Sequence, residues 1–369
     1  MRVLQVVGGL GIGGVERMAA VLSARLHGMG HDVLLVNLGS PGEHADAVAA
    51  AGVPVLHLGL SVPRTPRGLL RTVAGVARLW GIILRGRWDV VQTHLFKTAV
   101  LASPPARLTG AVVVGGIHGI DPSALQRRLM REVVRLQHAV VAVSGPLADR
   151  VVRDLGLPRR KLAVVPNGIE VDGALATAPA PARRHDVDTV VVGCVGRLHE
   201  RKGQLDLVRA FARAVRREPR ARLVLVGDGP LRPRIEQEVT GLGLGDTVVL
   251  AGAQPDVAPW LASFDVLVVP SHYEGFNLTA VEGMLARLPV VATAAGGPEE
   301  IVEAGTTGLL VPPRDVPALA DALVELCRDD VARARMGRAG RDRARSRYLA
   351  PAMAEGYAAL YHRLRAARR

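Results

Sequence analysis

Short apolar runs alternate with longer amphipathic segments along most of the chain. Each run has the length of a buried strand, and the longer segments carry apolar residues at helical spacing. In the first half the pattern predicts strands at 2–7, 32–38, 53–58, 89–93, 111–117 and 139–143. In the second half it predicts strands at 189–195, 222–226, 247–251, 265–269, 290–293 and 308–311. Strands and helices that alternate in this way form parallel sheets covered on both faces, so we expect an α/β fold.

One segment interrupts this alternation. Residues 174–188 are rich in Ala, Pro and Arg, which is typical of a linker. We therefore predict an N-terminal domain over 1–173, the linker, and a second α/β domain over 189–348. A helix and a basic tail over 349–369 would follow. A length of 369 residues favours two such domains, and a hinge between them would leave a cleft.

The composition narrows the class of protein. Hydrophobic residues make up 49% of the chain but aromatic residues only 3%, so the core must be largely aliphatic. Two cysteines, Cys194 and Cys327, are too few for a disulfide framework, and Cys194 lies in a buried-strand pattern. Cysteine and histidine spacing predicts no metal site. With no signal peptide and no apolar span of transmembrane length, we expect a cytoplasmic protein whose membrane contact, if any, is peripheral.

The formal net charge of +13 comes almost entirely from Arg. Because this charge is spread over many helices with few aromatic residues between, we predict no nucleic-acid partner. A predicted helix over 66–85 groups four arginines within about 40° of one another, namely Arg67, Arg71, Arg78 and Arg85. Leu70, Val73, Val76, Trp80, Ile83 and Leu84 occupy its other side. A second helix groups Arg127, Arg128, Arg131 and Arg135. Such faces fit anionic lipid headgroups as well as they fit solvent.

The most informative residues are Glu274 and Glu282, which stand eight positions apart. The pattern predicts a strand at 265–269, a loop at 271–277 and a helix at 278–287. Glu274 would then follow the carboxyl end of a strand, where open α/β sheets bind ligands. Two carboxylates there can each accept a pair of hydroxyl hydrogen bonds, as a sugar and a ribose require. The alternative is a pair of ordinary acidic residues near a helix start, which the helix dipole favours.

Basic residues follow the first strand of the second predicted domain. Arg197 and Lys202 are placed to neutralise a diphosphate from two sides. Lys202 is notable because the chain uses Arg nearly everywhere else, and a compact ammonium suits a point contact with a phosphate oxygen. The alternative is a solvated basic helix start, which the dipole would disfavour. Gly227 ends the next strand, either as a simple turn or as part of the same sheet edge.

A glycine-rich loop over 8–14 follows the first strand and precedes a helix. Glycine lets the backbone approach a phosphate, and the helix N-terminus offers free N–H groups. The loop matches the dinucleotide pattern G-x-G-x-x-G, but that interpretation needs an acidic residue after the second strand, and 36–40 has none. We therefore favour Gly13 and Gly14 as part of a phosphate or sugar cradle over a nicotinamide or flavin site. A purely structural turn remains the alternative.

Two histidines end strands of the first predicted domain. His118 follows the strand at 111–117 and would face the cleft, and His94 ends the preceding strand. A lone histidine is more often structural than functional. Both interpretations stay open for His118, and the structural one is favoured for His94.

Taken in order, these motifs resemble those of the retaining glycosyltransferases of family GT4, also described as glycosyl transferases group 1. The resemblance covers nearly the whole chain, and its most specific element is Glu274…Glu282, which matches the family's E-x7-E motif. Support comes from Arg197, from Lys202 and from the segments 13–17 and 227–230. The resemblance implies the GT-B fold, with two Rossmann-like doubly wound parallel-sheet domains facing a cleft. It also implies a C-terminal helix that crosses back to the N-terminal domain.

The same resemblance implies a role for each residue. Glu274 would bind hydroxyls of the donor sugar, and Glu282 would hold the ribose of the nucleotide. Arg197 and Lys202 would bind the diphosphate and stabilise it as it leaves, while His118 would face the transferred sugar. Further donor contacts would come from Gly13, Gly14, Gly227, Gly275, Phe276, Asn277 and Leu278.

The implied reaction moves a hexose or amino-hexose from a UDP- or GDP-linked sugar to a hydroxyl, with retention of configuration and without metal or other cofactor. The acceptor would be a glycan, a lipid-linked compound or a secondary metabolite. Two other functions remain open: a sugar-nucleotide epimerase of the same fold, and a GT-B-like binding protein without activity. A nicotinamide oxidoreductase is disfavoured by the missing acidic residue.

Overall fold

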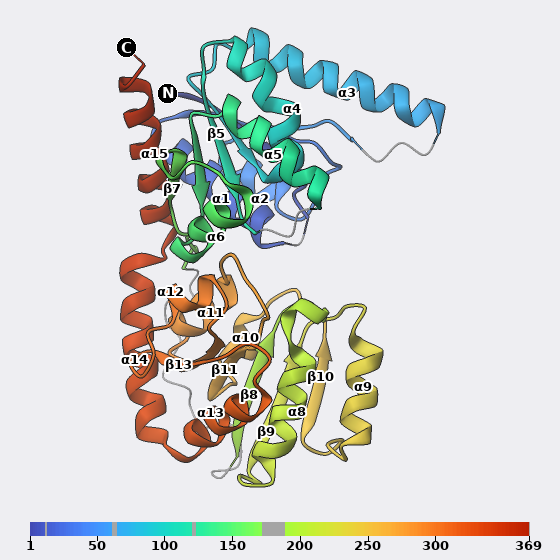
Figure 1. The fold of residues 1–369 in the computed structure, drawn as a ribbon, viewed down its shortest axis with the longest axis vertical. Helices are drawn as coiled ribbons and strands as arrows, with labels where there is room; N and C mark the ends of the chain where they lie inside the picture. The colour runs from blue at the N-terminus through green and yellow to red at the C-terminus, as the bar shows by residue number, and fades with distance from the viewer. Residues whose placement is uncertain (12, 61–64, 120–122, 172–188, 369) are drawn as a thin grey trace. The chain divides into compact units, whose positions relative to one another are not determined.

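The computed structural model describes residues 1–11, 13–60, 65–119, 123–171 and 189–368. They form two compact units (Figure 1). Unit 1 comprises Met1–Glu170 with Leu349–Arg369, and unit 2 comprises Val171–Tyr348. The predicted linker at 174–188 lies outside the described residues.

Unit 1 is built on a seven-stranded sheet with the order β3-β2-β1-β4-β5-β6-β7, and all of its pairings are parallel. The strands are β1 (Arg2–Val7), β2 (Asp32–Asn37), β3 (Val55–His57), β4 (Val90–His94), β5 (Val112–Ile117), β6 (Ala139–Ala142) and β7 (Leu162–Val164). The helices are α1 (Gly14–Gly28), α2 (Ala45–Ala50), α3 (Pro66–Arg85), α4 (Leu95–Leu108), α5 (Ala124–Leu136), α6 (Gly145–Leu155), the short η1 (Arg159–Lys161) and α15 (Ala350–Ala366).

Unit 2 is built on a six-stranded parallel sheet with the order β10-β9-β8-β11-β12-β13. Its strands are β8 (Val190–Val195), β9 (Ala221–Val226), β10 (Val248–Gly252), β11 (Val266–Val269), β12 (Val290–Thr293) and β13 (Gly308–Val311). Its helices are η2 (Glu200–Lys202), α8 (Gln204–Val215), α9 (Arg232–Gly241), α10 (Ala258–Leu261), α11 (Leu278–Leu285), α12 (Gly297–Ile301), α13 (Val316–Arg328) and α14 (Asp330–Arg347). The twelve predicted strands are confirmed within a few residues, and β7 is an additional strand that the apolar pattern did not predict.

Side chains along each central strand of unit 1 alternate between two helical layers. Val3 and Val7 of β1 join the core formed with α1 and α15, whereas Leu4 and Val6 join the core formed with α3 and α4. A strand that is buried on both faces has no side in contact with water, so neither face carries polar side chains. This is why the sequence has continuous apolar runs instead of strict alternation.

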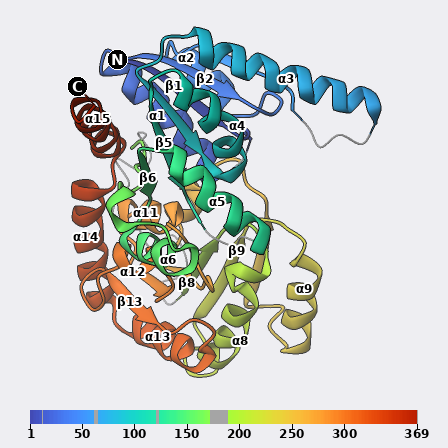
Figure 2. The ribbon, with the colours of Figure 1, turned by 45° about the horizontal axis from the view of Figure 1, so that its top comes forward.

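The last helix, α15, belongs to unit 1 although unit 2 precedes it in the chain. In two views it lies beside α1 and the strands of unit 1 (Figures 1 and 2). Tyr357 and Tyr361 are buried in the same core as α1, and the Tyr361 hydroxyl donates to Gln92 Oε1 over 3.1 Å. The predicted return of the C-terminal helix to the N-terminal domain is therefore confirmed.

The strand order reverses between β1 and β4 in unit 1 and between β8 and β11 in unit 2. At each reversal the loops leaving the two neighbouring strands turn to opposite faces of the sheet. Ligands of open α/β sheets bind at the carboxyl ends of the strands at this point. The residues that follow β1, β4, β8 and β11 therefore occupy the favoured positions for a site.

Replacing Tyr361 with Phe would remove the donor from a buried amide oxygen. We expect a loss of about 1–3 kcal/mol in the free energy of unfolding of unit 1, measured by chemical denaturation. Tyr357→Phe is the matched control, because its buried hydroxyl finds no partner among the described residues. This second variant should leave the stability unchanged or raise it. Equal losses in both variants would contradict a specific contribution from the Tyr361 hydrogen bond.

Candidate functional site

A charged cluster lies at the strand-order reversal of unit 2. Lys202, at the end of η2 after β8, forms an ion pair with Glu274, which follows β11. The Ser271 hydroxyl donates to the same carboxylate oxygen over 3.0 Å, and the Asn277 amide lies 3.4 Å from it. The Glu274 side chain is only 13% exposed, against 34% for Lys202. The carboxylate is thus held in place, while the ammonium remains accessible to a ligand.

Close backbone contacts bring the two charged residues together. Gly203 has a φ of +69°, and a Cβ at this position would lie 1.9 Å from the carbonyl oxygen of Pro270. The Arg201 carbonyl accepts a hydrogen bond from the backbone N–H of His272 over 2.8 Å. Only glycine combines this φ with so close an approach. The segment that carries Lys202 is therefore fixed against the segment that carries Glu274.

The backbone of Glu274 is held from the other side by the loop after β12. Glu274 N donates to the Ala295 carbonyl over 3.0 Å, and Gly297 N donates to the Glu274 carbonyl over 2.8 Å. Gly296 has a φ of +89°, and a Cβ there would lie 2.3 Å from the Glu274 carbonyl oxygen. Gly296 and Gly297 thus allow the loop after β12 to pack directly against the backbone of Glu274.

Helix α11 begins directly after the cluster and carries Glu282. The Asn277 side chain accepts a hydrogen bond from Ala280 N over 2.8 Å and caps the helix. Glu282 follows about one turn later, as predicted, and is only 4% exposed. Phe276, one of the predicted donor contacts, packs its ring edge against Tyr348, with ring centres 5.7 Å apart. The other two predicted contacts of this loop, Gly275 and Leu278, lie beside it, and Leu278 starts the helix.

Two glycine turns join at the carboxyl ends of β8 and β9. Gly227 has a φ of +135°, and a Cβ there would lie 2.1 Å from the Gly196 carbonyl oxygen. Leu198 N donates to the Asp228 carbonyl over 3.0 Å, which ties the two turns together. The Arg197 side chain is exposed, and among the described residues its guanidinium makes no ion pair. Arg197 is therefore available to bind an anion, and it lies close to Lys202 in the sequence.

The glycine loop of unit 1 lies at the other strand-order reversal. Gly13 is the N-cap of α1, and the Glu16 side chain folds back over it, so that a Cβ at Gly13 would lie 2.1 Å from Glu16 Oε2. A Cβ at Gly8, Gly9 or Gly11 would meet no atom within 4 Å. Residue 12 lies outside the described residues. Gly8, Gly9 and Gly11 therefore border open space, whereas Gly13 is covered by Glu16 and Leu10 is buried.

His94, which is buried, and His118, which is partly exposed, form a pair at the carboxyl ends of β4 and β5. His94 Nε2 lies 2.7 Å from Gln5 Oε1, and because an amide oxygen can only accept, this nitrogen carries the proton. His94 Nδ1 then accepts from His118 Nε2 over 3.3 Å. His118 Nδ1 is left as a buried acceptor with no partner among the described residues. Burial lowers the pKa of His118 to about 4 and that of His94 well below its usual value, so both rings are neutral at pH 7.

Several contacts of these clusters were missed at the sequence level. Ser271 follows a buried strand directly, so the rule that selected Glu274 would also have found it. Gln5 interrupts the apolar run of β1, Gln92 begins the polar end of β4, and the two are register partners in the sheet. Such an interruption of a buried strand is a usable signal, because a buried amide needs a hydrogen-bond partner.

The residues that the structure describes hold neither a metal-ligand cluster nor a membrane-spanning helix. Within them, no group of three or more His, Cys, Asp or Glu side chains is arranged to hold a metal ion. No helix in the same residues has both the length and the apolarity needed to cross a bilayer.

Comparison with known proteins gives a consistent family relationship. Residues 189–329 match the family described as Glycosyl transferases group 1, and residues 12–172 match Glycosyltransferase Family 4. The chain is 32% identical to the 2-deoxystreptamine N-acetyl-D-glucosaminyltransferase of Streptomyces fradiae over 84% of this chain and 82% of that protein. It is also 32% identical to the D-inositol 3-phosphate glycosyltransferase of Kribbella flavida, over 70% of this chain and 62% of that protein.

The fold has close structural neighbours. The crystal structure of Anabaena Alr3699/HepE in complex with UDP matches with a TM-score of 0.85 and 23% identity, over 98% of this chain and 99% of that chain. At this level of identity the similarity establishes the shared two-domain fold.

The neutral histidine pair predicts a loss of stability in acid. An unfolded histidine titrates near pH 6.5, whereas His118 in the folded chain has a pKa of about 4, so the unfolded state binds more protons in between. The stabilisation is complete above pH 6.5 and is lost progressively as the pH falls toward 4, by up to about 3 kcal/mol. Denaturant unfolding of His118→Gln should show a weaker pH dependence over this range. His362→Gln, at an exposed histidine, is the control, and an unchanged slope for His118→Gln would contradict this assignment.

Proposed function

The chain belongs to glycosyltransferase family 4 and is a nucleotide-sugar hexosyltransferase with the GT-B fold; from that premise we propose the details of its reaction. It moves a hexose or amino-hexose from a UDP- or GDP-linked donor to an acceptor hydroxyl, with retention of configuration and without a metal ion. The observation that carries this proposal is the Lys202–Glu274 pair at the strand-order reversal of unit 2.

In this proposal unit 2 binds the donor. The diphosphate is held by Lys202 and by the exposed Arg197, and the glycine turn at Gly227 allows its close approach. Glu274 accepts hydrogen bonds from hydroxyls of the sugar, and Glu282 accepts them from the ribose. Before the donor binds, Lys202 and Glu274 neutralise each other, so neither charge is left without a partner in a partly buried site.

The reaction itself breaks the bond between the anomeric carbon and the diphosphate oxygen. Positive charge develops on the sugar while negative charge grows on the diphosphate, where the two cations stabilise it. The acceptor oxygen attacks from the same face, and the departing diphosphate takes its proton. Two cations placed in this way supply the electrostatic stabilisation that a metal ion provides in other phosphate-transfer sites.

Unit 1 is proposed to bind the acceptor and to face the transferred sugar. In this proposal the neutral His118 ring faces the transferred sugar, and the open space beside the glycine loop accommodates the acceptor or the phosphate. The names of the two relatives point to 2-deoxystreptamine and D-inositol 3-phosphate, which are both polyhydroxylated rings. A secondary-metabolite acceptor of this size is therefore favoured here over a polymeric glycan.

Calorimetric titration with UDP, GDP, ADP and NAD tests the donor site. We expect one nucleoside diphosphate to bind, and Lys202→Met and Glu282→Gln each to weaken that binding by roughly 10- to 100-fold, because each removes a charged hydrogen bond. Lys97→Met is the matched control, since it removes an exposed lysine from unit 1. Turnover of Lys202→Met should fall by about 10² to 10³.

The same experiments separate the alternatives. Release of free sugar without any acceptor would indicate the epimerase, and tight donor binding without turnover would indicate an inactive binding protein. Binding of NAD alone, or equal affinity in all variants, would overturn the donor-site proposal. An inverted anomeric configuration in the product, read by NMR, would overturn retention, and loss of activity on addition of EDTA would overturn metal independence.

We further propose that helix α3 rests on an anionic membrane surface. Its side chains form three faces in the structure, where the sequence pattern had suggested two. Gly75, Leu79 and Ile83 face the sheet. A separate apolar face points to solvent, comprising Leu69, Leu70, Val73, Trp80 and Leu84, which are 42–70% exposed.

The four arginines form the third face of α3, and the helix contains no acidic residue. Its N-terminal part projects beyond the other elements of unit 1 in both views (Figures 1 and 2). An apolar stripe flanked by arginines is the arrangement that lies in the headgroup region of anionic membranes. The apolar stripe would enter the acyl boundary while the guanidinium groups remain at the phosphates.

Co-sedimentation with vesicles tests this surface. The protein should bind vesicles of phosphatidylglycerol and phosphatidylcholine but not vesicles of phosphatidylcholine alone. Changing Arg67, Arg71 and Arg78 to Gln, or Leu70 and Val73 to Ser, should reduce the binding at least about tenfold, because each removes one of the two contributions. The control changes Arg213, Arg216 and Arg338 of unit 2 to Gln. Unaltered binding of the α3 variants, or a dimer in solution that the Ser variant dissociates, would contradict membrane contact.

A further inference from the structure

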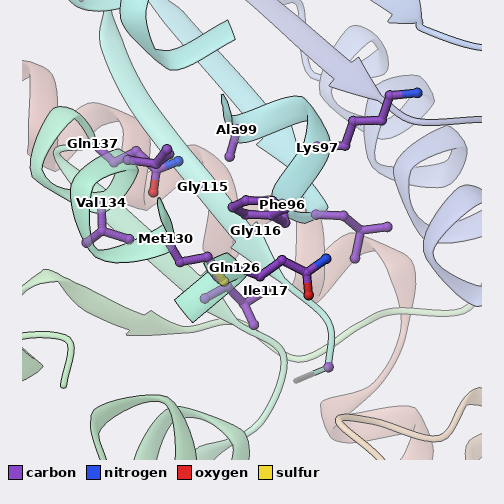
Figure 3. A pocket seen from close by; sticks show the side chains of 13 residues that line it. Phe96, Lys97, Ala99, Gly115, Gly116, Ile117, Gln126, Met130, Val134 and Gln137 are labelled. Carbon is purple, nitrogen blue, oxygen red and sulfur yellow. The ribbon is translucent and has the colours of Figure 1, made fainter. Parts of the chain in front are cut away.

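We propose that a pocket inside unit 1 binds an apolar group carried by the acceptor, such as an alkyl or aryl substituent. The pocket lies between α4, α5 and the carboxyl end of β5, and its volume is about 320 Å³ (Figure 3). This size is within the range of natural small-molecule sites. That the ligand is part of the acceptor depends on the proposed function. The shape and lining of the pocket involve only residues of unit 1 and do not depend on it.

A glycine on β5 lets a buried amide side chain lie at the floor of the pocket. Every second residue of β5 lies on the same face of the sheet, as Val113, Gly115 and Ile117 do. Gly115 has no side chain and leaves a gap between its two bulky neighbours. A Cβ at Gly115 would lie 2.4 Å from the Gln137 amide oxygen. The glycine therefore makes room for this amide, which is only 3% exposed and donates to the Ser103 hydroxyl over 3.3 Å.

The walls are mostly apolar. Phe96 and Ala99 come from α4, and Met130, Val133 and Val134 come from α5. Figure 3 shows the Phe96, Ile117 and Met130 side chains gathered at the pocket, whereas Lys97 points away from it. Protein interiors are close-packed, and an apolar space of this size gives water few hydrogen-bond partners. An apolar ligand that displaces the water would therefore gain free energy from the burial of both surfaces.

The position of the pocket connects it to the predicted acceptor side of the reaction. Ile117 and Gly119 both line it, and His118 lies between them in the chain. His118 is the residue that we propose to face the transferred sugar. An acceptor bound with its reacting hydroxyl at the carboxyl end of β5 could place an apolar substituent between α4 and α5, because Gly116 and Ile117 at that end also line the pocket. Among the described residues that line the pocket, Gln137 has the buried polar side chain, so a single polar atom in the substituent would also be tolerated.

Direct binding of two glucosides tests the pocket without turnover. Methyl and n-octyl β-D-glucopyranoside share the same sugar and differ only in the alkyl chain. Each buried methylene strengthens binding by up to about fourfold, so we expect the octyl compound to bind at least about 30-fold tighter by calorimetry below its micelle concentration. Ala99→Leu and Val133→Phe, which fill the pocket from its two helical walls, should each remove most of this preference.

Two controls make the result specific to the pocket. Ala49→Leu adds the same side chain on the exposed surface of α2 and should keep the octyl preference. Unchanged thermal melting and UDP affinity would show that the filled variants are folded. Equal affinity for both glucosides, or an octyl preference that survives both fillings, would overturn the proposal. If the octyl preference is present but no nucleotide binds, the pocket stands and the proposed donor site fails.

Discussion

The charged site of unit 2 depends on the close passage of one backbone segment against another. Gly203 lies so near Pro270 that no side chain fits between them, and the Arg201 carbonyl is hydrogen-bonded to His272. This contact sets the distance between the loop that follows β8 and the loop that follows β11. It therefore brings the Lys202 ammonium within ion-pairing distance of the Glu274 carboxylate. The charges are therefore positioned by rigid backbone before a ligand arrives. Such preorganisation is what makes electrostatic stabilisation effective in catalysis, because no dipole has to be reoriented during the reaction.

The two strand-order reversals carry different chemistry. In unit 2 the groups are an ammonium, an exposed guanidinium and two carboxylates, which suit a diphosphate and hydroxyl groups. In unit 1 they are glycines, an amide, two imidazoles that are neutral at pH 7, and the carboxyl group of Glu16, which folds over Gly13. Neutral donors and acceptors can orient a sugar without competing for the cations that the diphosphate needs. The division of charge between the units thus agrees with a donor on one and an acceptor on the other.

Much of the fold could be predicted because each strand is a continuous apolar run buried on both faces. β7 could not be predicted, since it has only three residues and follows the basic stretch of η1. The sheet edge that carries Glu274 and Lys202 was predictable from strand ends, but their ion pair was not, because it depends on the contact of Gly203 with a distant segment. The exposed apolar face of α3 was equally hidden. Periodicity shows that a helix has an apolar arc, but it does not show which part of the arc meets the sheet.

The place of α15 has a consequence for how the chain is made. Domains generally fold in order as they leave the ribosome, the N-terminal one first. Here the first core to be synthesised lacks Tyr357 and Tyr361 until the final helix has emerged, whereas every strand and helix of unit 2 is by then available. The apolar surface of α1 and the central strands that α15 covers therefore stays exposed while the whole of unit 2 is synthesised.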